Sequence, residues 1–116
     1  YGFDYVSRGA LKRSMLEKAY GMVSVDYTVN KIAKEFNADL LLGVHNPYVA
    51  HAGTLLRKPS IIYTDTENVG IASYLTFPFA DVILTPACFM ETIDPGKQVK
   101  INGFKDLAYL HPNNFL

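Results

Sequence analysis

The sequence lacks several features that would assign it to a class directly. Its single cysteine, Cys88, excludes an internal disulfide. We expect a buried apolar side chain there, because free cysteine is among the most buried residue types. Eleven basic and eleven acidic residues balance to a net charge of zero, which argues against nucleic-acid binding and against a polybasic membrane anchor. No apolar run is long enough to span a bilayer. We therefore expect a globular, cytoplasmic protein.

The glycine-rich phosphate-binding motifs are absent as well. Neither G-x-G-x-x-G nor G-x-x-x-x-G-K-[ST] occurs in the 116 residues, so the sequence does not support a dinucleotide or nucleoside-triphosphate site. A metal site is also disfavoured, because His45 and His51 are six positions apart rather than four and His111 is remote. We therefore expect neither a cofactor nor a metal.

Four short apolar runs, each followed by a polar cluster, are the clearest pattern in the chain. They cover residues 40–44, 60–63, 81–84 and 99–101, and they predict strands near residues 40–44, 60–64, 81–85 and 98–102. Helix-like segments separate them, which is typical of buried strands in a parallel sheet with right-handed crossovers. The alternation predicts an α/β fold with a Rossmann-like parallel sheet and flanking helices. Ligands of such sheets bind outside the carboxyl ends of the strands, where the polar clusters fall.

The segment before the first run carries the strongest helix signal. Apolar residues at spacings of three and four predict a helix over residues 10–37, packed across the sheet. The predicted apolar stripe consists of Leu11, Met15, Ala19, Met22, Val25, Val29, Ile32 and Phe36.

The remaining segments give weaker signals. Pro47 suits the first turn of a helix over residues 48–57. Three more helices are expected: one capped by Asp65 or Thr66 and ending near residue 76, one capped by Thr85 over residues 86–92, and one that follows the last strand and reaches about residue 110. Residues 3–7 read as a short strand and residues 94–96 as a turn.

The polar clusters supply the candidates for chemistry. Asp65 and Glu67 could act as a general base or hold sugar hydroxyls, with helix capping as the alternative. His45 could transfer protons near neutral pH; alternatively, Asn46 caps the next helix and His45 is partly buried. The catalytic candidates are Glu67, Asp65 and His45, and the substrate-binding candidates are Asn46, Thr64, Thr85, Asn102 and Gly103. We expect the last two to form a turn with a left-handed backbone, which could also let a ligand approach closely.

Several of these segments resemble a known family. Residues 59–67 read P-S-I-I-Y-T-D-T-E, residues 79–86 read F-A-D-V-I-L-T-P, and residues 101–112 read I-N-G-F-K-D-L-A-Y-L-H-P. All three resemble segments of a prokaryotic family of glycosyltransferase-like proteins, the domain-of-unknown-function family three-five-four. Residues 1–5 resemble the segment that precedes the long helix of that family, so the resemblance covers essentially the whole chain.

The resemblance implies a GT-B-like architecture, in which two Rossmann-like domains face a cleft. Residues 1–112 would be part of the amino-terminal domain, and residues 113–116 the start of an interdomain linker. It further implies that the protein acts on a nucleotide sugar and an acceptor. This chain alone would then be inactive, because the domain that holds the nucleotide sugar lies outside it. With strands of the parent sheet missing, an open sheet edge would favour self-association.

Two other functions stay open. The UDP-N-acetylglucosamine 2-epimerases share the implied fold, although the non-hydrolysing ones carry Gly-Asp-Thr where this chain has His45-Asn46-Pro47. A non-catalytic α/β interaction module, such as a receiver domain, would need an acidic pocket near its first strand and a lysine after its last. Lys105 could supply the lysine, but Asp4 has no acidic neighbour. The sequence thus leaves open whether the chain is an enzyme.

Overall fold

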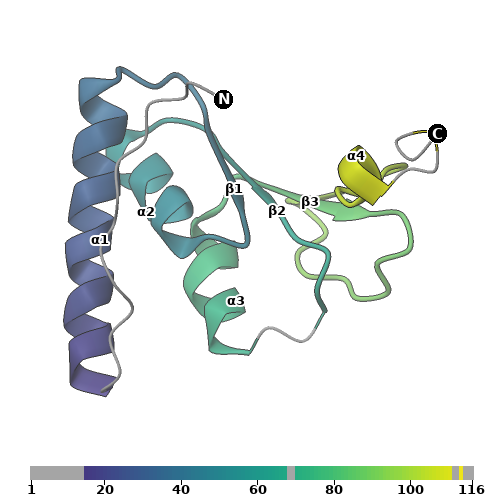
Figure 1. The fold of residues 1–116 in the computed structure, drawn as a ribbon, viewed down its shortest axis with the longest axis horizontal. Coiled ribbons are helices and arrows are strands. Elements are labelled where there is room, and N and C mark those ends of the chain that lie inside the picture. The colour runs from purple at the N-terminus through teal and green to yellow at the C-terminus, as the bar shows by residue number, and fades with distance from the viewer. Residues whose placement is uncertain (1–14, 68–69, 111–112, 114–116) are drawn as a thin grey trace.

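The computed structural model describes residues 15–67, 70–110 and 113 (Figure 1). Its elements in chain order are α1 (Met15–Glu35), β1 (Leu41–Val44), α2 (Pro47–Leu56), β2 (Ser60–Tyr63), α3 (Ile71–Thr76), the 3-10 helix η1 (Phe77–Phe79), β3 (Val82–Pro86), β4 (Gln98–Ile101) and α4 (Leu107–Leu110). The strand expected at residues 3–7 and most of the expected linker lie outside the described residues.

The four strands form one parallel sheet in the order β1-β2-β3-β4. Leu42 pairs with Ile61, Ile61 with Val82, and Leu84 with Val99. The four apolar runs and their parallel pairing are thus confirmed, and with them the Rossmann-like α/β fold class. All carboxyl ends of the strands meet at one edge of the sheet, because every pair is parallel.

The connections between the strands lie on one face of the sheet. Strands that follow one another in a single direction, joined by right-handed crossovers, place every crossover on the same side. Helix α2 accordingly packs on β1 and β2 and also contacts α3 and η1 (Figure 1). The core on this face is a cluster of four buried residues, Ala50, Ile62, Ala80 and Ile83. Gly53 lets α2 approach β2 closely, since a Cβ there would lie 2.7 Å from that of Ser60.

Helix α1 packs differently from our expectation. It lies beside α2 rather than across the sheet (Figure 1). Near its carboxyl end, Ala33 packs in one cluster with Leu41 of β1. The predicted apolar stripe is only partly correct, because Ile32 and Phe36 are exposed while Ala33 is buried. The face of α1 that contacts α2 and β1 contains Val29 and, four residues later, Ala33. The small side chain of Ala33 allows the helix to pack closely there.

The opposite face of the sheet is largely open. Leu42 is 68% exposed, Val44 58% and Val99 47%, and all three point away from α2. Parallel sheets normally carry cover on both faces. The expectation that the chain exposes apolar surface is therefore confirmed, and self-association through it remains a prediction.

Two expected helix starts are wrong. Helix α3 begins after Gly70 without a side-chain cap, so neither Asp65 nor Thr66 caps it. Strand β3 continues through Thr85 and Pro86, and the described residues 86–97 contain no helix. Pro86 fits there because it lies beyond the last residue of β2, where its missing N–H leaves no ladder bond open.

Two smaller expectations are also wrong, and one is confirmed. Cys88 is exposed rather than buried, since Phe89 next to it fills the core position. Neither Asn102 nor Gly103 has a positive φ. The turn at residues 94–96 is confirmed: the Asp94 Oδ1 accepts a hydrogen bond of 2.8 Å from the Gly96 amide, as in an Asx turn.

Candidate functional site

Polar residues lie at the edge of the sheet where β1 and β2 end. We call this region, which includes His45, Thr64 and Asp65, the polar edge. The His45 amide donates to the Tyr63 carbonyl at 2.9 Å, and the Thr64 amide donates to the Leu84 carbonyl at 2.9 Å. These bonds extend the ladder by one residue beyond each strand. They hold the backbones of His45 and Thr64 next to each other, although the two residues are nineteen positions apart.

His45 owes its orientation to a sharp turn between β1 and α2. Its φ is 43°, in the left-handed region that residues other than glycine rarely adopt. Asn46 then caps α2, with its Oδ1 accepting from the Tyr48 amide at 3.1 Å, and Pro47 begins the helix. The structure thus confirms that Asn46 is a capping residue and that His45 is partly buried. Such backbone strain costs on the order of 1–3 kcal/mol and concentrates at functional sites.

The contacts of the His45 ring define its protonation. Its Nδ1 lies 3.0 Å from the Thr64 Oγ1, and the Thr64 hydroxyl donates to the Thr66 carbonyl at 3.4 Å. Because that hydroxyl proton is directed at Thr66, we assign the proton of the shared bond to the histidine Nδ1. The Nε2 then carries a lone pair. It is buried, and it has no hydrogen-bond partner among the described residues.

Burial also favours the neutral form of this ring. It lowers the pKa of His45 below the ordinary value, against the smaller opposing effect of the Asp65 charge. The Phe77 ring contacts the imidazole edge-on, with 5.3 Å between the ring centroids. His45 is therefore a neutral base with an unused acceptor atom at the carboxyl edge of the sheet, a state suited to accepting a proton.

Asp65 is held by a lysine that the sequence did not single out for this site. The Lys105 Nζ forms an ion pair with the Asp65 Oδ2, and this hydrogen bond is the main cause that lowers the pKa of Asp65. The Lys105 amide donates to the Tyr63 hydroxyl at 3.3 Å, which anchors the segment before α4 over β2. Asp106 lies 3.9 Å from the same Nζ. The two ion-paired residues are forty positions apart, so only the fold shows the pairing.

Glu67 makes a separate contact. Its Oε1 accepts a hydrogen bond of 2.6 Å from the Met90 amide, and both residues are exposed. The bond ties the segment after β2 to the loop after β3. Glu67 therefore neither caps a helix nor joins the pairs that His45 and Asp65 form.

Within the described part of the chain, three further candidates form no hydrogen bond with the residues of those pairs. Thr85 is fully buried, and its Oγ1 accepts from the Gln98 Nε2 at 3.1 Å. Asn102 is exposed at the end of β4. At Gly103 an added Cβ would meet nothing within 4 Å, so no described group requires glycine there.

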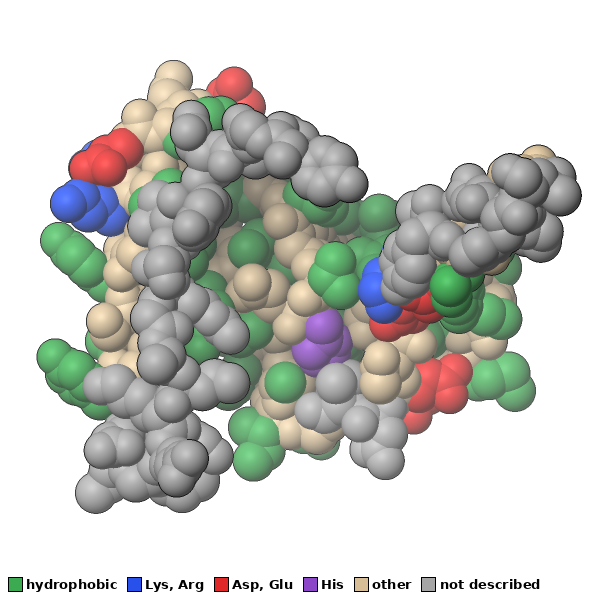
Figure 2. Space-filling model, in the orientation of Figure 1, with side chains coloured by type: hydrophobic (Ala, Val, Ile, Leu, Met, Phe, Trp, Pro, Cys, Tyr) green, Lys and Arg blue, Asp and Glu red, His purple; other side chains and the backbone are tan. Residues whose placement is uncertain are grey.

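The charges along the polar edge are mainly negative. Asp65, Glu67 and Asp106 provide three carboxylates against two ammonium groups, that of Lys105 and that of Lys100, whose Nζ donates to the carbonyl of Phe89, the residue before Met90. A histidine side chain lies in the middle of one face of the molecule, with acidic and basic side chains beside it (Figure 2). Excess negative charge disfavours a bound phosphate and suits hydroxyl groups, which donate to carboxylates. Within the described residues, no group of three or more His, Cys, Asp or Glu side chains could hold a metal ion.

Comparisons of this chain with protein-family models, with curated proteins and with solved structures gave no match. No helix in the described part of the chain is long and apolar enough to cross a membrane.

Proposed function

We propose that this chain is part of a glycosyltransferase-like protein that acts on a nucleotide sugar, and that its polar edge binds a hydroxyl-bearing acceptor. The observation that carries the proposal is the buried, unpartnered Nε2 of His45 at the carboxyl edge of the sheet. An unpaired polar atom of this kind costs about 1–3 kcal/mol. A ligand hydroxyl that donates to Nε2 would remove that cost.

The chemistry follows from the neutral state of His45. The acceptor hydroxyl donates its proton to Nε2, and its oxygen attacks the anomeric carbon of the donor sugar as the bond to the diphosphate breaks. Thr64 keeps the ring oriented through Nδ1. Nε2 is covered in this structure, so we propose that ligand entry displaces the Phe77 ring beside it. The edge is too acidic to favour the diphosphate, which another part of the complete protein would hold.

Titration by NMR tests this assignment on the chain itself. Backbone amide and His45 ring signals are followed while N-acetylglucosamine, UDP-N-acetylglucosamine or UDP is added. We expect shifts at His45, Thr64 and Asp65 with N-acetylglucosamine, smaller shifts with UDP-N-acetylglucosamine, because its diphosphate is disfavoured at this edge, and none with UDP alone. His45→Phe should abolish the shifts, and the matched control Glu91→Gln, on an exposed residue of the loop after β3, should not.

Two outcomes would overturn the proposal. Shifts at the polar edge with UDP alone would place an anion site there instead of a hydroxyl site. Unchanged spectra with all three ligands would favour a non-catalytic α/β interaction module.

A further inference from the structure

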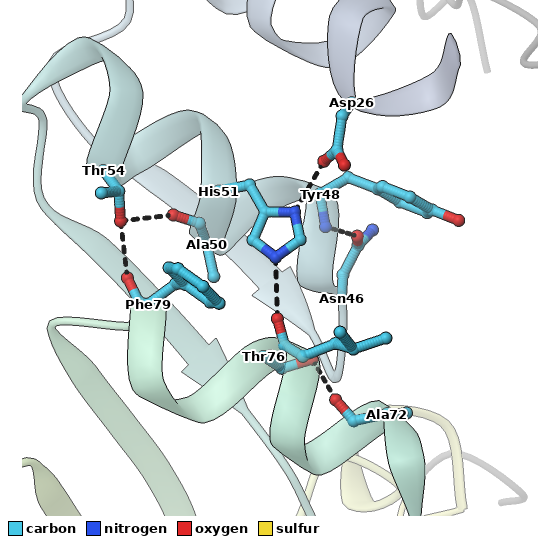
Figure 3. Close-up of polar contacts among 10 residues, drawn as sticks. Asp26, Asn46, Tyr48, Ala50, His51, Thr54, Ala72, Thr76 and Phe79 are labelled. Carbon is cyan, nitrogen blue, oxygen red and sulfur yellow. Dashed lines mark hydrogen bonds and ion pairs between the residues drawn. The ribbon is translucent and has the colours of Figure 1, made fainter. Parts of the chain in front are cut away.

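A second histidine, His51, lies where three helices meet. It projects from α2, and its Nδ1 is 2.8 Å from the Asp26 Oδ1 of α1 (Figure 3). Its Nε2 is 2.8 Å from the Leu75 carbonyl of α3. The side chains of His51 and Asp26 are only 16% and 23% exposed. The Phe79 ring of η1 packs edge-on against the imidazole at 4.8 Å between centroids.

Both contacts of the ring are with hydrogen-bond acceptors. A carboxylate and a backbone carbonyl have no proton to donate, so each ring nitrogen has to supply one. A neutral imidazole carries a single N–H and can satisfy only one of them. Only the doubly protonated imidazolium can satisfy both contacts at once, as a partner of the Asp26 carboxylate.

Among the described residues, Asp26 forms an ion pair with His51 and with no other group, although Lys34 and Tyr27 line the same surface hollow. The described part of α3 and all of η1 contribute no charged side chain, and α2 contributes only His51. On α1, the nearest acidic or basic residues along the helix after Asp26 are Lys31, Lys34 and Glu35, of which Lys31 and Glu35 pair with each other at 3.8 Å. Tyr48, one turn before His51, is the titratable neighbour on α2. Asp26 is thus the charged group that the ring contacts.

We propose that His51 is a proton-dependent clasp that holds α1 and α3 on α2. When the ring loses a proton, one nitrogen lone pair faces an oxygen, and that contact becomes repulsive. The clasp is therefore closed at low pH and opens as the pH rises. This inference is independent of the proposed function, since it concerns helix attachment and not the polar edge.

The helices that the clasp joins are connected in sequence to the polar edge. Helix α2 starts directly after the polar turn at residues 45–46, and α3 follows the segment that carries Asp65 and Glu67. A second bond reinforces the same junction: the Thr54 hydroxyl donates to the Phe79 carbonyl at 3.2 Å (Figure 3). Opening the clasp would free α1 most, because α1 packs mainly on α2.

Nitrogen-15 NMR of the histidine rings and amide hydrogen exchange test the clasp in the 116-residue chain. At pH 5.5 we expect two N–H protons on His51 and one on His45. Between pH 5.5 and 8.5, the protection factors of α1 amides, corrected for intrinsic exchange, should fall about tenfold or more.

Two variants separate the clasp from general instability. Asp26→Asn lets the amide donate to Nδ1 while Nε2–H donates to Leu75, so a neutral ring suffices and the pH dependence of α1 protection should disappear. His51→Phe keeps the ring contact with Phe79 but removes both hydrogen bonds, so α1 protection should be low at every pH. The control His45→Gln should retain the pH dependence.

Two results would overturn the inference. One is a singly protonated His51 at pH 5.5 in the folded wild-type chain. The other is protection of α1 that changes with pH equally in the wild type and in Asp26→Asn. The first measurement needs no variant, so it decides the question even if a substituted chain does not fold.

Discussion

His45 and His51 lie six residues apart, and each packs edge-on against a phenylalanine, yet their contacts differ in kind. The Nδ1 of His45 is shared with a hydroxyl that can donate or accept, and its Nε2 has no partner among the described residues. Both nitrogens of His51 face acceptors. One ring is left able to take a proton, and the other is fixed between helices. The difference arises from position, because His45 ends a strand whereas His51 lies within a helix.

The largest effect should appear when each ring is replaced by leucine. His51→Leu leaves the Asp26 carboxylate mostly buried without its partner, and we expect a loss on the order of 2 kcal/mol in the free energy of unfolding. His45→Leu gives up one hydrogen bond to Thr64 and removes an unpaired atom, so its cost should be below about 1 kcal/mol. Urea denaturation of both variants measures the difference. Equal losses would contradict the distinction between the two sites.

His45 should also make the stability of the fold depend on pH. Burial lowers the pKa of His45, so the unfolded chain takes up a proton there more readily than the folded chain. The stability that neutral His45 contributes is present above the unfolded value of about 6.5 and is lost as the pH falls through it. Denaturation curves from pH 5 to 8 should therefore slope upward with pH less steeply in His45→Gln than in the wild type; equal slopes would refute this.

Backbone strain at His45 gives a third contrast. With φ at 43°, glycine fits this position without the steric cost that a Cβ imposes. His45→Gly should be more stable than His45→Ala by about 1 kcal/mol, whereas at His51, inside α2, glycine should be less stable than alanine by a similar amount. Thermal unfolding of the four variants tests the reversal. Alanine more stable than glycine at both positions would show that residue 45 carries no strain.

The two faces of the sheet also differ, and this difference predicts how the chain self-associates. The face under α2 is packed, while Leu42 and Val44 are exposed on the other. We expect concentration-dependent self-association at high concentration, weakened by Val44→Lys without loss of secondary structure. Light scattering against concentration measures it. The matched change Tyr74→Lys, at an exposed residue on the helical side, should leave association unchanged.

The smallest effect is expected at Glu67. Its Oε1 accepts from the exposed Met90 amide, and Gln offers the same acceptor, so Glu67→Gln should change stability by less than about 0.5 kcal/mol. Under the proposed function, Glu67→Gln should leave glycosyl transfer within a few-fold of wild type, while His45→Phe should lower it on the order of 100-fold. A loss of transfer activity on the order of 100-fold in Glu67→Gln would instead identify Glu67, and not His45, as the general base.

The strands were predictable because apolar runs and their polar ends follow from local sequence. Pro47 and Asn46 likewise mark the start of α2 by local chemistry. The packing face of α1 was not predictable from the sequence. Ile32 and Ala33 are adjacent, and which of the two is buried depends on the side chains of α2 that pack against them. The helix starts predicted at Thr66 and Thr85 were wrong for a similar reason. Both side chains are suitable for capping, but the local sequence does not determine whether a helix follows.

The polar edge was predictable as a place but not as a set of contacts. Parallel strands guarantee that His45, Thr64 and Asp65 come to one edge. Which atoms meet there depends on register and on the segment after β4, which supplies Lys105 from forty positions away. The unpaired Nε2 of His45 arises from that packing and has no signature in the sequence.

The strand order has a consequence for how the chain acquires its structure. Because each strand pairs with the next one along the sequence, every strand–connection–strand unit closes its own contacts over a short stretch of chain. Low separation between contacting residues is associated with fast folding, since little loop entropy is lost before contacts form. The sheet can grow by addition of one strand at a time, and we expect its folding to be faster than that of parallel sheets whose central strands come from distant segments.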